Sequence, residues 1–125
     1  MVLIFGGAYQ GKLAYALERF GLSRGDAHFC RETCVDAPKG KIIYEVDKWI
    51  LALVRADADV TESVERLAAD NPDAIVICND ISCGVVPVDP VLRKWREETG
   101  RALARLAQRS DEVVRLFCGI PTRIK

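Results

Sequence analysis

The sequence has only one histidine, no net charge and no long hydrophobic run. Eighteen basic and eighteen acidic side chains cancel, so we expect no broad basic surface for nucleic acid or for an anionic membrane. No apolar run approaches the roughly 20 residues of a membrane-spanning helix, and the apolar start, residues 2–5, is too short for the core of a signal peptide. We therefore expect a cytoplasmic protein that binds neither nucleic acid nor membrane and holds any anionic ligand through a few local groups.

Cysteine is present in an odd number, five residues, and no secretion signal accompanies it. Both observations argue against a disulfide framework. Cys30 and Cys34 are spaced like the start of a metal site, but with His28 as the only histidine the other ligands would have to be thiolates. Cys78 and Cys118 lie in strand-like runs, so we expect them to fill core space. The pattern favours reduced, mostly structural thiols over a structural metal.

The order of apolar patterns predicts an α/β fold in a single domain of 125 residues. Short, continuous apolar runs, typical of buried parallel strands, occupy residues 2–5, 41–45, 74–78 and 112–118. Helical periodicity marks residues 13–20, 46–54, 61–70 and 90–106, with Thr61 and Asp89 as expected N-caps. Residues 21–40 show no period and are expected to form a loop that contains one short strand or turn, and residues 119–125 a turn and a short extended end.

A glycine-rich loop separates the first strand from the first helix. It contains Gly6, Gly7, Ala8, Tyr9, Gln10, Gly11 and Lys12. In such a loop backbone N–H groups surround a phosphate, the helix N-terminus adds its dipole, and the lysine reaches the outer phosphates. Leu13 replaces the Ser or Thr that would bind Mg²⁺. We therefore expect a P-loop NTPase-like, three-layer fold with a mostly parallel sheet, in which Gly6–Leu13 binds GTP or ATP above a weakened Mg²⁺ site.

Polar side chains at the ends of other strands are the next candidates, because ligands of parallel α/β sheets bind outside the carboxyl ends of the strands. Glu45 ends the second strand and is the candidate to support Mg²⁺; the alternative is a solvated carboxylate. Asp80 would orient a substrate or act as a base, although an Asx turn explains it more simply. Three arginines of the last helix would approach phosphates if one face of that helix borders the site, but a solvated charged face is the simpler interpretation: Arg93, Arg96 and Arg101.

Residues 76–125 resemble the C-terminal half of the bifunctional adenosylcobinamide kinase/adenosylcobinamide-phosphate guanylyltransferase family. The family pattern there is roughly TNEVGxGIVP, FRDxxGRxNQ and ADEVxLVVSGxPxxxK. The matching residues in this sequence are Asn79, Asp80 (for Glu), Gly84, Val86, Pro87, Arg96, Gly100, Arg101, Asp111, Glu112, Val113, Gly119, Pro121 and Lys125. The N-terminal IFGGAYQGKLAYA is similar to the family's VTGGxxSGKSxxA, and KIIYEVDKWILALV looks like its second catalytic strand, with Glu45 where an acidic residue meets the nucleotide.

The resemblance implies a P-loop fold, trimeric assembly and two activities. One phosphorylates the aminopropanol hydroxyl of adenosylcobinamide, and the other transfers GMP from GTP to that phosphate through a guanylylated histidine. His28 is the only histidine here, and its context, HFCRET, matches the family's His-x-x-x-Arg-Pro poorly. The family's histidine lies in a longer segment between the first helix and the 41–45 strand, and Leu103 and Ala104 replace its polar Asn-Gln.

Two hypotheses follow from these residues. The first is a shortened nucleotide-dependent kinase that acts on adenosylcobinamide with Mg²⁺ and GTP or ATP, with Lys12, Glu45, His28 and Asp80 as its catalytic candidates. The second is a non-catalytic relative that binds a nucleotide or a corrinoid. An unrelated small P-loop kinase would require the C-terminal match to be a coincidence.

Overall fold

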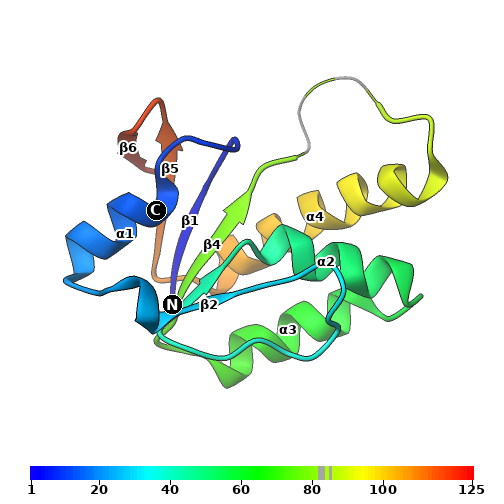
Figure 1. Cartoon of the computed structure of the whole chain (residues 1–125), viewed down its shortest axis with the longest axis horizontal. Helices are drawn as coiled ribbons and strands as arrows, with labels where there is room; N and C mark the ends of the chain where they lie inside the picture. Colours follow the sequence, from blue (N-terminus) through cyan, green and yellow to red (C-terminus); the bar gives the residue numbers. More distant parts are fainter. Residues whose placement is uncertain (82–83, 85) are drawn as a thin grey trace.

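Six strands form one mostly parallel sheet, and four α-helices cover it (Figure 1). This computed structural model describes residues 1–81, 84 and 86–125; Cys83, one of the five cysteines, lies outside them. The elements are β1 (Val2–Gly6), α1 (Lys12–Phe20), the 3₁₀ turn η1 (Arg24–Asp26), β2 (Ala27–Phe29), β3 (Ile42–Tyr44), α2 (Val46–Arg55), α3 (Val60–Asp70), β4 (Ile75–Asn79), α4 (Pro90–Arg109), β5 (Glu112–Phe117) and β6 (Ile120–Arg123). The architecture confirms the α/β prediction and is consistent with a P-loop NTPase-like fold.

The strand order is β2-β3-β4-β1-β5-β6, and only β6 runs antiparallel to its neighbour. Strand β1 lies in the centre, paired in parallel with β4 and β5. Its last residue, Gly6, is in register with Asn79, the last residue of β4. The carboxyl ends of β1, β3 and β4 therefore meet at one edge of the sheet, and the glycine-rich loop leaves the sheet there.

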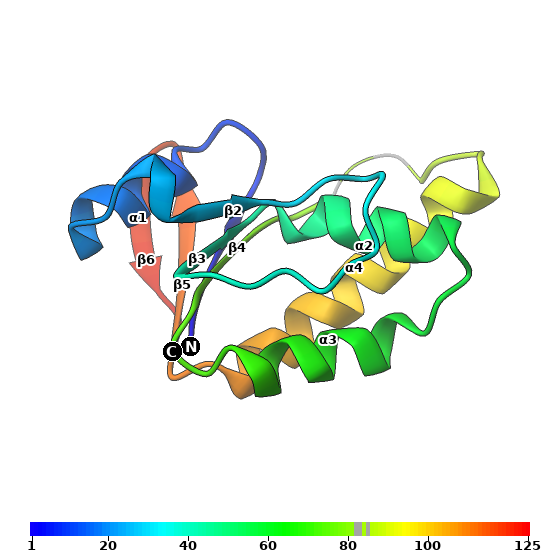
Figure 2. The ribbon, with the colours of Figure 1, turned by 60° about the horizontal axis from the view of Figure 1, so that its bottom comes forward.

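The two faces of the sheet are covered unequally, as Figures 1 and 2 show. Leu3, Ile43 and Val76 pack with α2, α3 and α4 in the larger core cluster. Their neighbours along the strands, such as Ile4 and Ile77, pack with α1 on the opposite face. The alternation follows from the two-residue period of a strand, and it gives the predicted three layers with one helix on one side and three on the other.

The region of residues 21–40 contains one turn and one strand of three residues, η1 and β2. After β2 the chain runs out along α2 and returns to β3 (Figure 2). The Trp49 indole N–H donates to the Val35 carbonyl at 3.2 Å, which ties this segment to α2. The expectation of a loop with a single short strand is confirmed, and Trp49 is buried in the core as part of the larger cluster.

Three details differ from the sequence-based expectations. Asp59, not Thr61, caps α3: its carboxylate accepts from the Glu62 N–H at 3.0 Å, and this cap lies two residues earlier than the predicted one. Cys118 is exposed, because it lies in the β5–β6 turn with a φ of 51° rather than in a strand. Residues 120–123 form β6 where only an extended end was expected. The predicted cap at Asp89 is confirmed.

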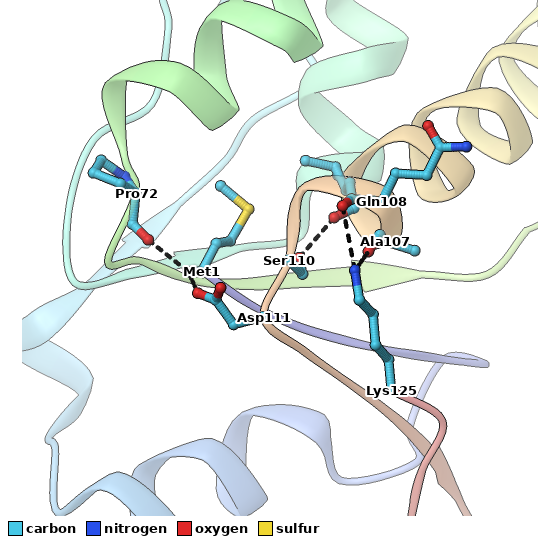
Figure 3. A network of polar contacts seen from close by, with 8 residues as sticks. Met1, Pro72, Ala107, Gln108, Ser110, Asp111 and Lys125 are labelled. Atoms are coloured by element: carbon cyan, nitrogen blue, oxygen red, sulfur yellow. Dashed lines mark hydrogen bonds and ion pairs between the residues drawn. The ribbon is translucent and has the colours of Figure 1, made fainter.

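Polar contacts join several elements at the sheet edge opposite the loop (Figure 3). The Met1 amino group donates to the Asp111 carboxylate at 2.9 Å. The Lys125 ammonium donates to the carbonyl oxygens of Ala107 and Gln108, in the last turn of α4, at 3.1 and 3.3 Å. A cation at that position satisfies carbonyl groups that a helix leaves without partners and interacts favourably with the helix dipole. In the described part of the chain, no helix combines the length and apolar character needed to cross a bilayer.

We predict that Gly6→Ala strongly destabilises the protein. A Cβ at this position would lie 2.3 Å from the Leu116 carbonyl oxygen, and the φ of +151° is unfavourable for any L side chain. Strain and steric overlap together should lower the free energy of unfolding by about 2 kcal/mol or more. Chemical denaturation measures this value.

Gly100→Ala is the matched control. A Cβ at Gly100 would meet nothing within 4 Å, so the change in the middle of α4 should stabilise by about 0.5–1 kcal/mol. Equal unfolding midpoints for the two variants would contradict the role given to Gly6.

Candidate functional site

The glycine-rich loop, Gly6–Leu13, combines a left-handed backbone with unpartnered amides. Tyr9 and Gly11 have φ values of 59° and 82°. In the part of the chain that the structure describes, no backbone N–H group from Gly7 to Gly11 forms a hydrogen bond of good geometry, although a turn at Ala8–Tyr9 brings the Gln10 N–H toward the Gly7 carbonyl. The Gln10 side chain accepts from the Cys118 N–H, which fixes the loop against the β5–β6 turn. Several free amides at the start of a helix are the arrangement that binds a phosphate group.

A hollow of about 650 Å³ lies between the loop and the end of β3. Residues 8–13 line one side of this loop hollow. Arg24, Tyr44, Glu45, Lys48 and Asn79 line the other. Its volume is in the range of small-molecule sites. With Lys12, three cationic side chains face the space beside the free amides, so the loop hollow suits a polyanionic ligand.

Lys12 is held inside the loop rather than in solvent. Lys12 is only 5% exposed, and its ammonium group donates to the Gly7 carbonyl oxygen at 2.6 Å. Burial lowers the pKa of Lys12, while the carboxylates of Asp47 and Glu45 act in the opposite direction. A lysine placed in this way carries its charge to the loop with little freedom to move.

Glu45 connects β3 to α2 in a left-handed conformation, with a φ of 61°. Such a conformation is uncommon for a residue other than glycine and points the side chain away from the strand direction. The Glu45 carboxylate pairs with the Lys48 ammonium at 2.8 Å, and this contact raises the pKa of Lys48. Strand β4 lies between β3 and β1, and Glu45 lines the loop hollow together with residues of the loop.

The position of Leu13 limits any metal site. Leu13 is 9% exposed and packs with Ile4, Ala16 and Leu116 in the smaller core cluster, so it offers no oxygen ligand. Among residues 1–81, 84 and 86–125, no three His, Cys, Asp or Glu side chains gather as a metal site would need. Mg²⁺ often binds through one carboxylate together with phosphates and water. The residues therefore fit an ion held mainly by a nucleotide, with Glu45 as the carboxylate among the residues that line the loop hollow.

Asp47 is a buried carboxylate that the sequence analysis missed. It is 3% exposed, and its two oxygens accept from the backbone N–H and the side-chain amide of Asn79 at 3.0 and 3.2 Å. Burial raises the pKa of Asp47, and the hydrogen bonds from Asn79 oppose that effect. The signal was present: Asp47 lies three residues before Ile50 and seven before Val54, on the flank of the inward apolar stripe.

The family model described as cobinamide kinase / cobinamide phosphate guanyltransferase matches residues 33–124. The chain belongs to this family. The family match includes Glu45, Asp47, Asn79 and all of α4, and it begins after the glycine-rich loop, so it does not bear on that loop. No curated protein matches the sequence.

His28 does not line the loop hollow. By the resemblance, it is the residue that guanylyl transfer would require. It is in register with Ile43, which faces α2–α4, and it lines a separate hollow of about 480 Å³ with Cys30, Cys34 and Trp49. The adjacent Phe29 contacts Tyr44 on the other face, with ring centroids 5.3 Å apart. The structure therefore brings Lys12 and Glu45 together and places His28 elsewhere.

Asp80 and the three arginines also lie outside the lining of the loop hollow. The Asp80 backbone N–H donates to the Gly6 carbonyl oxygen at 2.8 Å, which extends the pairing of β4 with β1 beside the loop. Arg93, Arg96 and Arg101 line a different hollow, beside α4. The polar group that β4 contributes to the loop hollow is Asn79 rather than Asp80.

We predict that raising the pH weakens the contribution of Asp47 to stability. Its folded pKa lies above the ordinary value of 3.8, so between these two values the folded protein binds more protons than the unfolded chain. The free energy of unfolding of the wild type, relative to Asp47→Asn, should therefore fall as the pH rises from about 3.8 through the raised pKa and stay constant above it. Denaturation of both proteins from about pH 4 to about pH 8 measures this difference; a difference independent of pH would contradict the prediction.

Proposed function

We propose that this chain binds the phosphates of GTP or ATP at Gly6–Leu13 and transfers the terminal phosphoryl group to the alcohol of a cobinamide-type corrinoid. The observation that carries the proposal is the set of unpartnered amides from Gly7 to Gly11 beside the buried Lys12. Membership of the cobinamide kinase / cobinamide phosphate guanyltransferase family supports the reaction class. We further propose a homotrimer from the family resemblance, which sedimentation measurements would test.

Lys12 would supply the main electrostatic stabilisation in this reaction. In the ligand-free protein the Lys12 ammonium donates to the Gly7 carbonyl oxygen at 2.6 Å, so the cation already points into the loop. Phosphate oxygens that enter the loop would replace this carbonyl as its partner. The free amides of residues 7–11 bind the same group. Because both are in place before the ligand arrives, little reorganisation accompanies the growth of negative charge during transfer.

The acceptor would lie on the opposite side of the loop hollow. There the alcohol oxygen forms a bond to the terminal phosphorus, the bond from that phosphorus to the bridging oxygen breaks, and the Glu45 carboxylate takes up the proton of the alcohol. Lys48, 2.8 Å from Glu45, keeps that carboxylate in position. When bound, Mg²⁺ would neutralise phosphate charge and be held mainly by the nucleotide; Glu45 would support either the ion or the attacking hydroxyl.

A second candidate function is binding without catalysis. Leu13 favours it, since this residue is part of the core cluster and provides no metal ligand. His28 lines a different hollow from the loop, and this separation favours binding without guanylyl transfer. The Lys12 and Glu45 arrangement favours the kinase, which is why we place the kinase first.

We predict that label moves from the γ-phosphate of GTP or ATP to cobinamide when the protein, Mg²⁺ and both substrates are incubated together. The same mixture with α-labelled GTP tests guanylyl transfer, which would leave acid-labile label on the protein that disappears in His28→Ala. Tight nucleotide binding with no transfer of either label would overturn the kinase proposal in favour of the binding function.

We also predict that Lys12→Ala weakens nucleotide binding by about tenfold or more, because charge-assisted hydrogen bonds to phosphate are lost. Lys39→Ala removes the same charge from an exposed residue outside the loop hollow and should leave the affinity unchanged. Titration calorimetry without Mg²⁺ isolates the contribution of the loop. Equal affinities for the two variants would show that the nucleotide binds elsewhere.

A further inference from the structure

Asp47 holds the side chain of Asn79 in one orientation at the edge of the loop hollow. One carboxylate oxygen accepts from the Asn79 backbone N–H at 3.0 Å and the other accepts from its side-chain nitrogen, Nδ2, at 3.2 Å. Asp47 is itself fixed, because the Trp95 indole N–H donates to its backbone carbonyl at 2.7 Å. The contacts connect α2 to both β4 and α4, so Asp47 has little freedom to release Asn79.

This arrangement decides which atom of the Asn79 amide faces the ligand. A primary amide donates through nitrogen and accepts through oxygen, whereas a carboxylate only accepts. The nitrogen must therefore face Asp47, since the reverse orientation would set two oxygens against each other. The remaining atom, Oδ1, has no hydrogen-bond partner within the described residues, and Asn79 lines the loop hollow.

An amide oxygen selects ligands that donate hydrogen bonds. Phosphate oxygens of a nucleotide are acceptors, so they bind the loop amides and Lys12 but gain nothing from Asn79 Oδ1. An alcohol hydroxyl does donate. The register of Gly6 with Asn79 places this acceptor directly beside the loop, next to where the phosphates would lie.

We propose that Asp47 is a positioning residue that turns the Asn79 amide oxygen into the loop hollow, and that Asn79 binds the alcohol hydroxyl of the phosphoryl acceptor. The inference rests on the proposed function, since it names the group that binds the acceptor in that reaction. The hydrogen bond holds the hydroxyl beside the phosphates before transfer, and the proton leaves for Glu45 as the new bond forms.

The test compares wild type with Asp47→Asn and Asn79→Ala in three titrations: with GTP, with cobinamide, and with a cobinamide analogue that lacks the alcohol hydroxyl. The wild type should bind the alcohol about tenfold or more tightly than the analogue, because a site built for a hydroxyl rejects a ligand without one. Both variants should lose that preference and keep their affinity for GTP. Asp57→Asn is the control: it makes the same chemical change at an exposed residue that pairs with Lys94 at 3.6 Å, outside the loop hollow.

A spectroscopic measurement on the ligand-free protein tests the positioning role independently of binding. The Asn79 side-chain amide resonances, assigned by their absence from Asn79→Ala, should shift in Asp47→Asn and stay in place in Asp57→Asn. Thermal denaturation establishes that each variant is folded. Unchanged Asn79 resonances in a folded Asp47→Asn protein would overturn the role given to Asp47.

The remaining outcomes separate this inference from the proposed function. Cobinamide binding with no preference for the hydroxyl overturns the role of Asn79 and leaves the proposed function standing. Loss of GTP affinity in Asn79→Ala, with the hydroxyl preference kept, assigns Asn79 to the phosphates and also overturns the inference. A wild-type protein that binds no cobinamide overturns both, while the Asn79 resonances still decide whether Asp47 orients the amide.

Discussion

The parallel pairing of β1 with β4 and β5 is the constraint on which the site depends. It brings Gly6 into register with Asn79 on one side, and on the other it brings Gly6 so close to the Leu116 carbonyl that no side chain fits. The loop therefore leaves the sheet at a defined point, beside the end of β4 and within reach of the β5–β6 turn. The glycine-rich loop, Glu45 and Asn79 take their positions from this edge of the sheet.

Groups of opposite charge, Lys12 and Asp47, lie buried at the same edge of the sheet. Burial lowers the pKa of Lys12 and raises that of Asp47, which means that each charged form is disfavoured on its own. Both groups are hydrogen-bonded, Lys12 to the Gly7 carbonyl and Asp47 to Asn79. A buried charge is tolerated when its hydrogen bonds are made and an opposite charge is near. In the proposed reaction, Lys12 would bind phosphate and the Asn79 amide oxygen would bind the alcohol.

The departures from the family pattern fall on separate parts of the structure. Leu13 belongs to the core beneath the loop; it offers no metal ligand and leaves the amides of residues 7–11 in place. His28 lies on a short edge strand whose register directs it toward α2–α4, away from the loop hollow. Under the proposed function, phosphoryl transfer and guanylyl transfer therefore depend on different regions, and a change in one need not affect the other.

Local sequence determined the main strands and helices, because an apolar run or a 3.6-residue period depends only on neighbouring residues. It predicted β1, β3, β4 and β5, all four α-helices, the Asp89 cap and the loop at Gly6–Leu13. It gave little signal for β6, whose four residues are all exposed and show no alternation. The cap of α3 was misplaced by two residues, because Asp59 and Thr61 both have side chains suited to capping and only the helix start distinguishes them.

The tertiary structure alone decided which side chains share a hollow. The odd and even positions of β2 face opposite sides of the sheet, so pairing with β3 placed His28 in a different hollow from Tyr44 and Glu45. Asp47 and Asn79 are 32 residues apart and meet only because α2 packs against the end of β4. The residues supply the chemistry of the site, but strand register and helix packing, which act between distant segments, determine which groups meet and which atom of each faces the ligand.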